Sequence, residues 1–314
     1  MTALKHTHSY KSNDVLNDEK EIEKLEFLLG KILLPAISLT QGSNPVVPTE
    51  LWEVLKHLPY STRYEMYASM EIGDHIMGQD AIVRRSRRLS MYATKSALKQ
   101  LTSETHRNVG RKFAKISHRD PLTLLNHLVN RIESYENMID PVVESFKFLN
   151  PLSLDILSYV LVRHVASERS KLKSDGTNVS DWLQALATFS GVVFRRFYTM
   201  ELKGLLQYIV TRLKESGGNL ELCVLSRLIE EMAGIESFQD TTNKALSGGR
   251  VLKRTSSVIE RIAHSKKSRK ASQKLQDVIV RDEAFALPFL ILMAQQKYVH
   301  YLVTHSSPGI NSHQ

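Results

Sequence analysis

The side chains of this sequence that could do chemistry are mostly cations, and they gather in three stretches. Lys and Arg at such density can bind phosphate groups or acidic protein surfaces, with an affinity that falls steeply as the salt concentration rises. We therefore treat the following eleven residues as candidates for contact with a partner or with nucleic acid: Arg84, Arg85, Arg87, Arg88, Arg111, Lys112, Lys115, Lys266, Lys267, Arg269 and Lys270.

The third stretch, Arg250–Lys274, has the most unbalanced charge. It contains nine basic residues and one acid, Glu260, so its cations repel one another unless an anionic partner neutralises them. Ser and Lys fill most of the positions between Ser265 and Ser272, where a packed helix needs apolar residues. We predict a weakly packed connector with exposed charge. The alternative is a solvated helix face or a mobile loop that binds nothing.

The other reactive side chains do not form a catalytic or metal-binding pattern. The twelve histidines are scattered, and His300 and His305 are five positions apart, which points them in different directions on a helix. The single cysteine, Cys223, has apolar neighbours and is interpreted as a small buried hydrophobe. The glycine pairs lack the lysine of a phosphate-binding loop. We predict a protein that is not an enzyme, with no metal, no cofactor and no small-molecule substrate.

An aromatic group, Trp182, Phe189, Phe194 and Phe197, permits two interpretations. The rings could stack on bases, as in proteins that bind single-stranded nucleic acid. Their helical spacing favours a packed core instead, because aromatic side chains bury much area there. We predict that Trp182 and Phe189 are buried.

The elements that carry these residues are predicted to be helices. Apolar residues recur at steps of three and four, which places them on one face of a helix. Two such stripes are Leu122, Leu125, Leu128, Val129, Ile132 and Tyr135, and Leu202, Leu205, Leu206, Ile209, Val210 and Leu213. We predict an all-α fold, a HEAT-like solenoid of stacked antiparallel helix pairs that runs from about Asp18 to Val303.

Helix starts can be predicted from polar residues that cap the first turn, especially before a proline. The predicted caps are Asp120, Asp140 and Asn150, each followed by proline, together with Thr49 and Ser180. Pro288 has two possible places: the first turn of the last helix, or a kink in a helix that begins near Asp282.

Composition is that of one globular domain. The 314 residues include 42 Lys and Arg against 33 Asp and Glu, a net charge of +9 that suits an anionic partner. We predict a single domain over residues 18–303, with disordered ends at 1–17 and 304–314. One cysteine indicates a reducing compartment. The apolar runs Phe27–Leu39 and Phe285–Ala294 are shorter than the roughly 20 residues of a membrane span, so no membrane contact is expected.

Several strings of the sequence resemble one family in order and spacing. They include LLPAISL (Leu33–Leu39), LWEVLKHLPYSTRYEMY (Leu51–Tyr67), the segment Gly110–Leu149, MAGIE (Met232–Glu236) and FALPFLILMAQQ (Phe285–Gln296). The family is that of the large scaffold subunit of the THO complex. Its members are much longer, and this sequence is similar to their central part.

The resemblance implies a non-enzymatic nuclear scaffold that supports mRNP assembly and mRNA export. It also implies a fold like the middle domain of translation-initiation scaffolds, which bind the two lobes of a DEAD-box helicase. The implied partners are the other THO subunits and the DEAD-box RNA helicase of the export machinery, with RNA as a further candidate. Two other hypotheses remain open: a helical module that binds RNA directly, and a helical scaffold in translation or mRNA decay.

Overall fold

The computed structural model describes residues 15–40, 44–72, 81–176, 178–215, 220–234, 266–282 and 285–305. Over these ranges the chain is helical, and its only β pairing is an isolated bridge between Leu172 and Val179. The all-α prediction is therefore confirmed. The predicted ends lie largely outside the described residues, and so does the whole segment 250–265.

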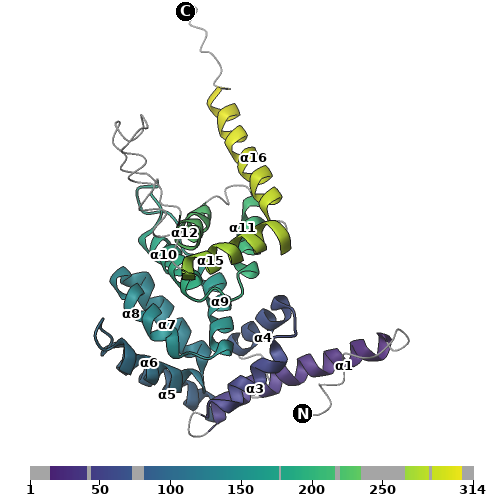
Figure 1. Ribbon diagram of the computed structural model, residues 1–314, viewed down its shortest axis with the longest axis vertical. Coiled ribbons are helices and arrows are strands. Elements are labelled where there is room, and N and C mark those ends of the chain that lie inside the picture. The colour runs from purple at the N-terminus through teal and green to yellow at the C-terminus, as the bar shows by residue number, and fades with distance from the viewer. Residues whose placement is uncertain are drawn as a thin grey trace, which may run out of the picture.

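The first part of the chain forms an arm at one edge of the molecule (Figure 1). Its elements are α1 (Val15–Phe27), the π-helical turn η2 (Leu28–Leu33), α2 (Leu34–Ala36), the 3-10 turn η3 (Ile37–Leu39), α3 (Val46–Leu55) and α4 (Tyr60–Ile72). The turn η2 packs on α4, and α3 and α4 pack on the centre of the molecule.

Two helical hairpins and a central helix follow. Their elements are α5 (Ala81–Leu98), α6 (His106–Ser117), α7 (Pro121–Ser134), η5 (Glu136–Met138), α8 (Ile139–Ser145), η6 (Phe146–Phe148) and α9 (Pro151–Val165). Helix α5 packs on α6 and α7, and α6 packs on α8.

The last part of the chain packs above these layers. Its elements are α10 (Asp181–Arg196), α11 (Lys203–Lys214), α12 (Leu222–Ala233), α15 (Lys266–Gln276), the π-helical turn η7 (Asp277–Asp282) and α16 (Ala286–His305). Helix α10 lies along α12, and α15 covers both. Helix α16 contacts α11 and extends away from the body (Figure 1). No described helix is both long and apolar enough to cross a membrane.

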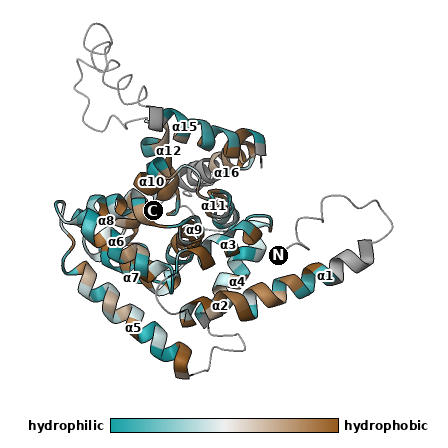
Figure 2. Ribbon diagram, turned by 60° about the horizontal axis from the view of Figure 1, so that its bottom comes forward, coloured by the Kyte–Doolittle hydropathy of each residue, from teal (hydrophilic) through white to brown (hydrophobic). Residues whose placement is uncertain are grey.

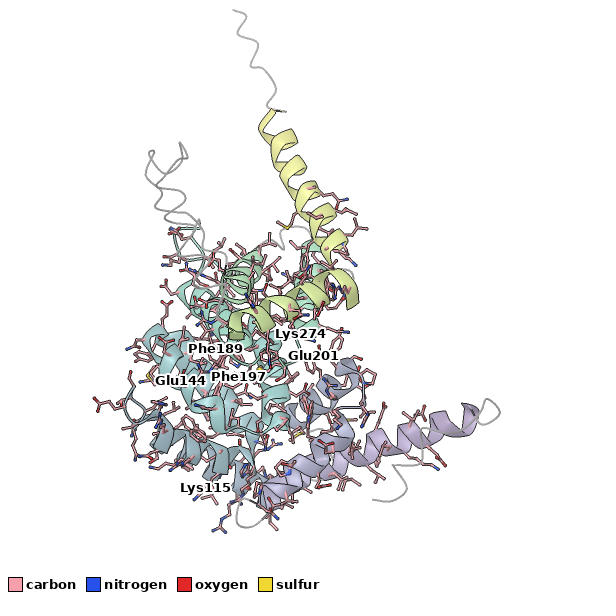
Figure 3. All side chains as sticks on the ribbon, in the orientation of Figure 1. Lys115, Glu144, Phe189, Phe197, Glu201 and Lys274 are labelled. Atoms are coloured by element: carbon pink, nitrogen blue, oxygen red, sulfur yellow. The ribbon has the colours of Figure 1, made fainter. Side chains whose placement is uncertain are left out.

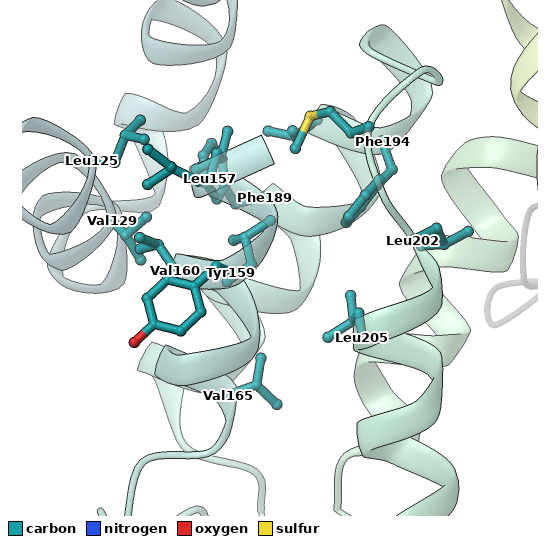
Figure 4. Packing of buried hydrophobic residues seen from close by; sticks show 14 of the residues in the cluster. Leu125, Val129, Leu157, Tyr159, Val160, Val165, Phe189, Phe194, Leu202 and Leu205 are labelled. Carbon is teal, nitrogen blue, oxygen red and sulfur yellow. The ribbon is translucent and has the colours of Figure 1, made fainter. Parts of the chain in front are cut away.

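Helix α9 is the centre of the fold. It contacts α3, α4, α7, α10 and α11, and apolar side chains on nearly all of its sides are buried. Leu157 and Val160 of α9 pack near Leu125 and Val129 of α7, and Phe189 of α10 lies beside them (Figure 4). A helix that is apolar all round is expected to be buried in this way. Phe189 is fully buried, as predicted.

The predicted caps Asp120 and Asn150 are confirmed. The Asp120 side chain accepts from the Thr123 amide, and the Asn150 side chain accepts from the Ser153 amide. The start at Ser180 is also correct, although its side chain makes no capping bond. Pro288 lies in the first turn of α16, where its missing N–H costs no hydrogen bond.

The predicted caps Thr49 and Asp140 are wrong. Helix α3 already begins at Val46, where Asn44 accepts from the Val46 amide at 3.0 Å, and the Thr49 hydroxyl donates back to the Pro45 carbonyl. Helix α8 begins at Ile139, so Asp140 lies inside its first turn. The 3-10 turn η5 leads directly into α8, so the helix starts two residues before Pro141, the first helical residue that a cap at Asp140 would give.

The prediction that Trp182 is a core residue is wrong as well. Trp182 is only half-buried. Its indole N–H donates to the Ser170 carbonyl at 3.0 Å. The Arg169 guanidinium carbon lies over the ring, 4.1 Å from the ring centroid. The ring thus packs at the edge of the core, with the loop residues Arg169 and Ser170 also in contact with it.

Candidate interface on helices α5 and α6

The first basic stretch, Arg84–Arg88, lies on α5, and the second, with Arg111, Lys112 and Lys115, lies on the neighbouring helix α6. Helix α5 turns small residues inward, and this stripe fits closely against α6 and α7 because none of the side chains is bulky. The buried residues are Val83, Ser86, Ser90, Thr94 and Ala97. Most charged side chains of α5 are therefore on its other sides.

The carbonyl of Ser38 joins the start of α5 to the end of α6. The Ser86 hydroxyl donates to it at 2.6 Å, and the Arg119 Nε donates to it at 2.9 Å. Ser38 is the middle residue of the 3-10 turn η3, so the N-terminal arm holds both helices at this point. This contact places the arginines of Arg84–Arg88 beside the C-terminal end of α6, although the two stretches are separate in sequence.

Arg87 differs from the other arginines of its stretch. Its Nη2 donates to the Met70 carbonyl at 2.7 Å, and its charge acts on the buried carboxyl of Asp120. Burial raises the pKa of Asp120, and the Thr123 hydrogen bonds and the charges of Arg87 and Arg119 oppose this rise. Arg87 therefore holds α5 to α4 and to the start of α7, and is half-buried.

The other members of the two stretches are exposed. Arg84, Arg85 and Arg88 extend from α5. On α6, the Arg111 guanidinium lies 5.9 Å from the Phe148 ring centroid, and the Lys112 ammonium donates to the Gln100 side chain at 2.5 Å. Figure 3 shows Lys115 at the outer edge of this part of the molecule.

This helical hairpin carries the whole charge excess of the protein. Residues 81–119 contain eleven Lys and Arg and one acid, Glu104, a formal charge of +10. The rest of the chain has 31 basic and 32 acidic residues, a charge of −1. A surface with this imbalance attracts anions more strongly than the net charge of the chain indicates.

Several cations elsewhere in the described part of the chain are neutralised by carboxylates of the same chain. The ion pairs outside α5 and α6 include Arg163 with Glu71, Arg169 with Glu133, Lys171 with Glu221, Arg195 with Glu231, and Arg196 with Glu144. Among the described carboxylates, none pairs with Arg84, Arg85, Arg88, Arg111 or Lys115. On the described surface of this hairpin, several cations that pair with no described carboxylate therefore lie together.

The third basic stretch is not near the other two. Its described residues lie on α15, which packs on α10 and α12, and Figure 2 shows α15 and α5 on opposite sides of the molecule. Arg269 and Lys270 are exposed, and the Lys270 ammonium lies 5.5 Å from the Tyr198 ring centroid. Lys266 and Lys267 begin the helix, and their side chains lie outside the described ones.

The predicted weakly packed connector is wrong for residues 266–274. They form most of α15, whose residues Ala271 and Leu275 are buried, as is Val278 in the turn η7 that follows. These three apolar positions, at steps of four and three, are enough to seat α15 on α10 and α12. Two of them lie beyond Ser272, outside the segment whose composition suggested a connector. The remainder of Arg250–Lys274 lies outside the described residues.

The described part of the chain meets the requirements of neither a metal site nor a reactive thiol. No group of three His, Cys, Asp or Glu residues could hold a metal ion there. Burial and the nearby Glu221 carboxylate raise the pKa of the Cys223 thiol to about 11, which leaves it protonated and unreactive at neutral pH. A hollow between α12 and α15 is lined mainly by polar residues such as Arg269, Gln273 and Asp277.

The sequence analysis missed further exposed residues of α5. Tyr92 and Lys95 lie on the same helix as the first arginine stretch, Lys99 follows directly after the end of that helix, and all three residues are exposed. The order Arg85, Arg88, Tyr92, Lys95, Lys99 has alternating steps of three and four residues. This spacing can be recognised in the sequence alone, because it places residues on one face of a helix. The signal was missed because only consecutive basic residues were considered.

The comparisons with known proteins all find similarity to the same family. A sequence model described as "THO complex subunit 2 N-terminus" matches residues 6–111, and one described as "Transcription- and export-related complex subunit" matches residues 113–187. Together they cover more than half of the chain, and they meet within α6.

Relatives named THO complex subunit 2 match over most of this chain. The Arabidopsis thaliana protein is 38% identical over 285 residues, which are 88% of this chain and 15% of that protein. The human protein is 35% identical over 290 residues, or 89% of this chain and 18% of its own length. The Saccharomyces cerevisiae protein is 29% identical over 227 residues. The chain spans less than one fifth of these relatives, and it belongs to the THO complex subunit 2 family.

Proposed function

We propose that this chain is a non-enzymatic scaffold segment of a THO-type complex in the nucleus, where it binds a DEAD-box RNA helicase and supports mRNP assembly and mRNA export. The observation that supports this proposal is the similarity to THO complex subunit 2, which covers 88% of the chain at 38% identity in one relative. The other THO subunits are the further partners that this assignment implies.

The helical layers supply the rigidity that such a scaffold needs. Buried polar contacts cross-link helices that are far apart in sequence, including Arg63 of α4 with Asp155 of α9. A rigid surface that binds a half-open arrangement of two helicase lobes more tightly than the open or closed arrangement shifts the population toward it. ATP turnover then rises without a catalytic group from the scaffold.

The test uses the purified chain and the DEAD-box ATPase of the export machinery from the same organism. We expect a complex that survives moderate salt, and an ATPase rate that rises with the concentration of the chain. A helicase that neither binds nor changes its rate would contradict the proposal. Stronger binding to a translation-initiation helicase would favour the alternative of a scaffold in translation or mRNA decay.

The cations of α15 are proposed to increase the rate of this association. Reversal of Lys266, Lys267, Arg269 and Lys270 to Glu is expected to lower the association rate and flatten its salt dependence. Circular dichroism should show an unchanged fold. Unchanged association at low salt would mean that this cluster is only a solvated surface.

Direct RNA binding is a second candidate function. The observation that favours it is the formal charge of +10 on residues 81–119, in a chain whose other residues sum to −1. Phosphate groups are the anions that such a surface would attract in a nuclear RNA-processing complex.

A further inference from the structure

The outer face of α5 carries a line of exposed side chains directly opposite its buried face. A helix turns by about 100° per residue, so the direction opposite Ser90 is close to that of residues 85, 88, 92 and 99. The structure agrees, because these residues are all exposed, as is Lys95 beside them. The line consists of Arg85, Arg88, Tyr92 and Lys95 of α5 and of Lys99 directly after it, whose amide still donates to the Lys95 carbonyl, and we call it the α5 outer stripe.

The stripe is long enough for an extended ligand. From residue 85 to residue 99 it covers about 21 Å along the helix axis, at about 1.5 Å per residue. Figure 2 shows α5 at the periphery, with no other helix on its outer side. No described carboxylate pairs with the four cations of the stripe. They would therefore meet an anionic ligand without first breaking an internal ion pair.

Tyr92 has no packing role that explains its position. Its ring is 65% exposed and makes no stacking or cation contact with any described residue. Arg88 lies four residues before it and Lys95 three residues after it, so cations lie about one turn away on either side. An aromatic ring between cations is the combination used to bind single-stranded nucleic acid, where the cations hold phosphates and the ring stacks on a base.

The ring also distinguishes between the possible anionic ligands. An acidic protein surface would be attracted by the cations alone and offers no flat partner for Tyr92. In a duplex the bases are stacked on one another and cannot reach a ring on a helix surface. A single strand can place its phosphates along the cations and one base on the ring.

We propose that the α5 outer stripe is a binding site for single-stranded RNA, with phosphates on Arg85, Arg88, Lys95 and Lys99 and a base stacked on Tyr92. This inference rests on the RNA-binding candidate given above and specifies its site. It does not depend on the helicase contact. The stripe would hold a strand close to a helicase bound elsewhere on the same scaffold.

The test measures fluorescence anisotropy of a labelled oligouridine of about 16 nucleotides, the upper end of typical site sizes for one binding module. The charge variant is Arg85→Gln, Arg88→Gln and Lys99→Gln. We expect it to weaken binding about tenfold or more at low salt. The slope of log affinity against log salt should decrease by about 2, since each phosphate contact contributes roughly 0.7 for a single strand.

The stacking variant is Tyr92→Ala, and its matched control is Tyr92→Phe. Loss of the ring should weaken binding about fivefold or more with the salt slope unchanged, because one stacked base contributes about 1–3 kcal/mol. Phenylalanine keeps the ring and should bind like the wild type. A duplex RNA of the same length should bind the wild type more weakly and should not respond to Tyr92→Ala.

A second control removes the same charge elsewhere. Lys24→Gln, Lys147→Gln and Lys214→Gln change exposed lysines that lie off the stripe, and they should weaken RNA binding less than about threefold. The proposal is overturned if this control weakens binding as much as the charge variant, if Tyr92→Ala has no effect, or if the wild type does not bind the oligouridine.

The helicase assay, run on the same variants, separates this inference from the scaffold proposal. We expect the stripe variants to bind the helicase normally. If the charge variant loses the helicase and the wild type binds no RNA, the stripe is a protein contact and the RNA site is wrong. If RNA binding behaves as expected while the helicase does not bind, only the scaffold proposal fails.

Discussion

Arg63 and Asp155 form a two-point ion pair between α4 and α9, deep inside the protein. The Arg63 Nε donates to Asp155 Oδ2 and its Nη2 donates to Oδ1, both at 2.9 Å. The two side chains are 7% and 4% exposed. The Tyr67 hydroxyl also donates to Asp155 at 2.8 Å, and Arg63 Nη1 donates to the Leu58 carbonyl. Every strong polar atom of the pair thus has a partner.

We expect Asp155→Asn to destabilise the protein by roughly 3–5 kcal/mol, because it leaves the buried Arg63 charge with only the longer contact to Glu201, at 3.6 Å. Urea unfolding followed by circular dichroism measures this loss. The matched control is Glu230→Gln, which breaks an ion pair with the exposed Arg227 and should cost less than about 1 kcal/mol. Equal losses in the two variants would show that the buried pair does not hold α4 to α9.

The contact between α10 and α12 depends on Gly191. A Cβ atom at this position would lie 2.7 Å from the Arg227 carbonyl oxygen and 2.9 Å from Glu231 Cγ. We therefore expect Gly191→Ala to destabilise the protein by about 1–3 kcal/mol, since backbone must move to relieve the overlap. Helix propensity alone would make alanine stabilising by about 1 kcal/mol. The sign of the change in unfolding free energy decides between these effects.

Phe189 and Trp182 are both on α10 but should respond differently to truncation. Phe189 is fully buried and contacts Phe146 edge-on at 6.1 Å between ring centroids. Its replacement by Ala should cost about 3–5 kcal/mol. Trp182 is half-buried at the Ser170 loop, so Trp182→Ala should cost clearly less. Thermal unfolding of the two variants provides the comparison, and a larger loss at Trp182 would contradict this account of the core.

Glu133 makes stability depend on acid pH. Burial alone would raise the pKa of this carboxyl, but hydrogen bonds from His164 and Arg169 outweigh it and lower the pKa below the ordinary value of 4.5. A lowered carboxyl pKa stabilises the folded state above the unfolded value, and this contribution is lost as the pH falls through the folded value. We expect the unfolding free energy to decline below about pH 4.5 for this reason.

The check is the urea midpoint of wild type and Glu133→Gln between about pH 7 and pH 3. The variant should be less stable at neutral pH and should lose less stability on acidification. Some decline should remain, because Lys171 and Arg212 similarly hold the pKa of Glu221 low despite its burial. Glu136→Gln, an exposed change in the adjacent turn, serves as the control. Parallel curves for wild type and Glu133→Gln would show that Glu133 is not responsible.

The sequence by itself determined the helices and most of the core. The stripe from Leu122 to Ile132 is buried on α7, and the caps at Asp120 and Asn150 start helices as predicted. These features are local: the i, i+3 and i+4 geometry of a helix and the first-turn amides depend on residues that are close in the chain. The string-by-string resemblance to the THO family is likewise contained in the sequence alone.

Only the tertiary structure decided which charged residues are neutralised. Arg63 and Asp155 are 92 positions apart, and nothing local to either indicates the other. The same holds for Arg87, whose partner is the Met70 carbonyl, whereas its neighbours Arg85 and Arg88 lie on the outer stripe. Pairing at such separations depends on how whole helices pack, because that packing sets which side chains come within hydrogen-bond distance and which are left to solvent.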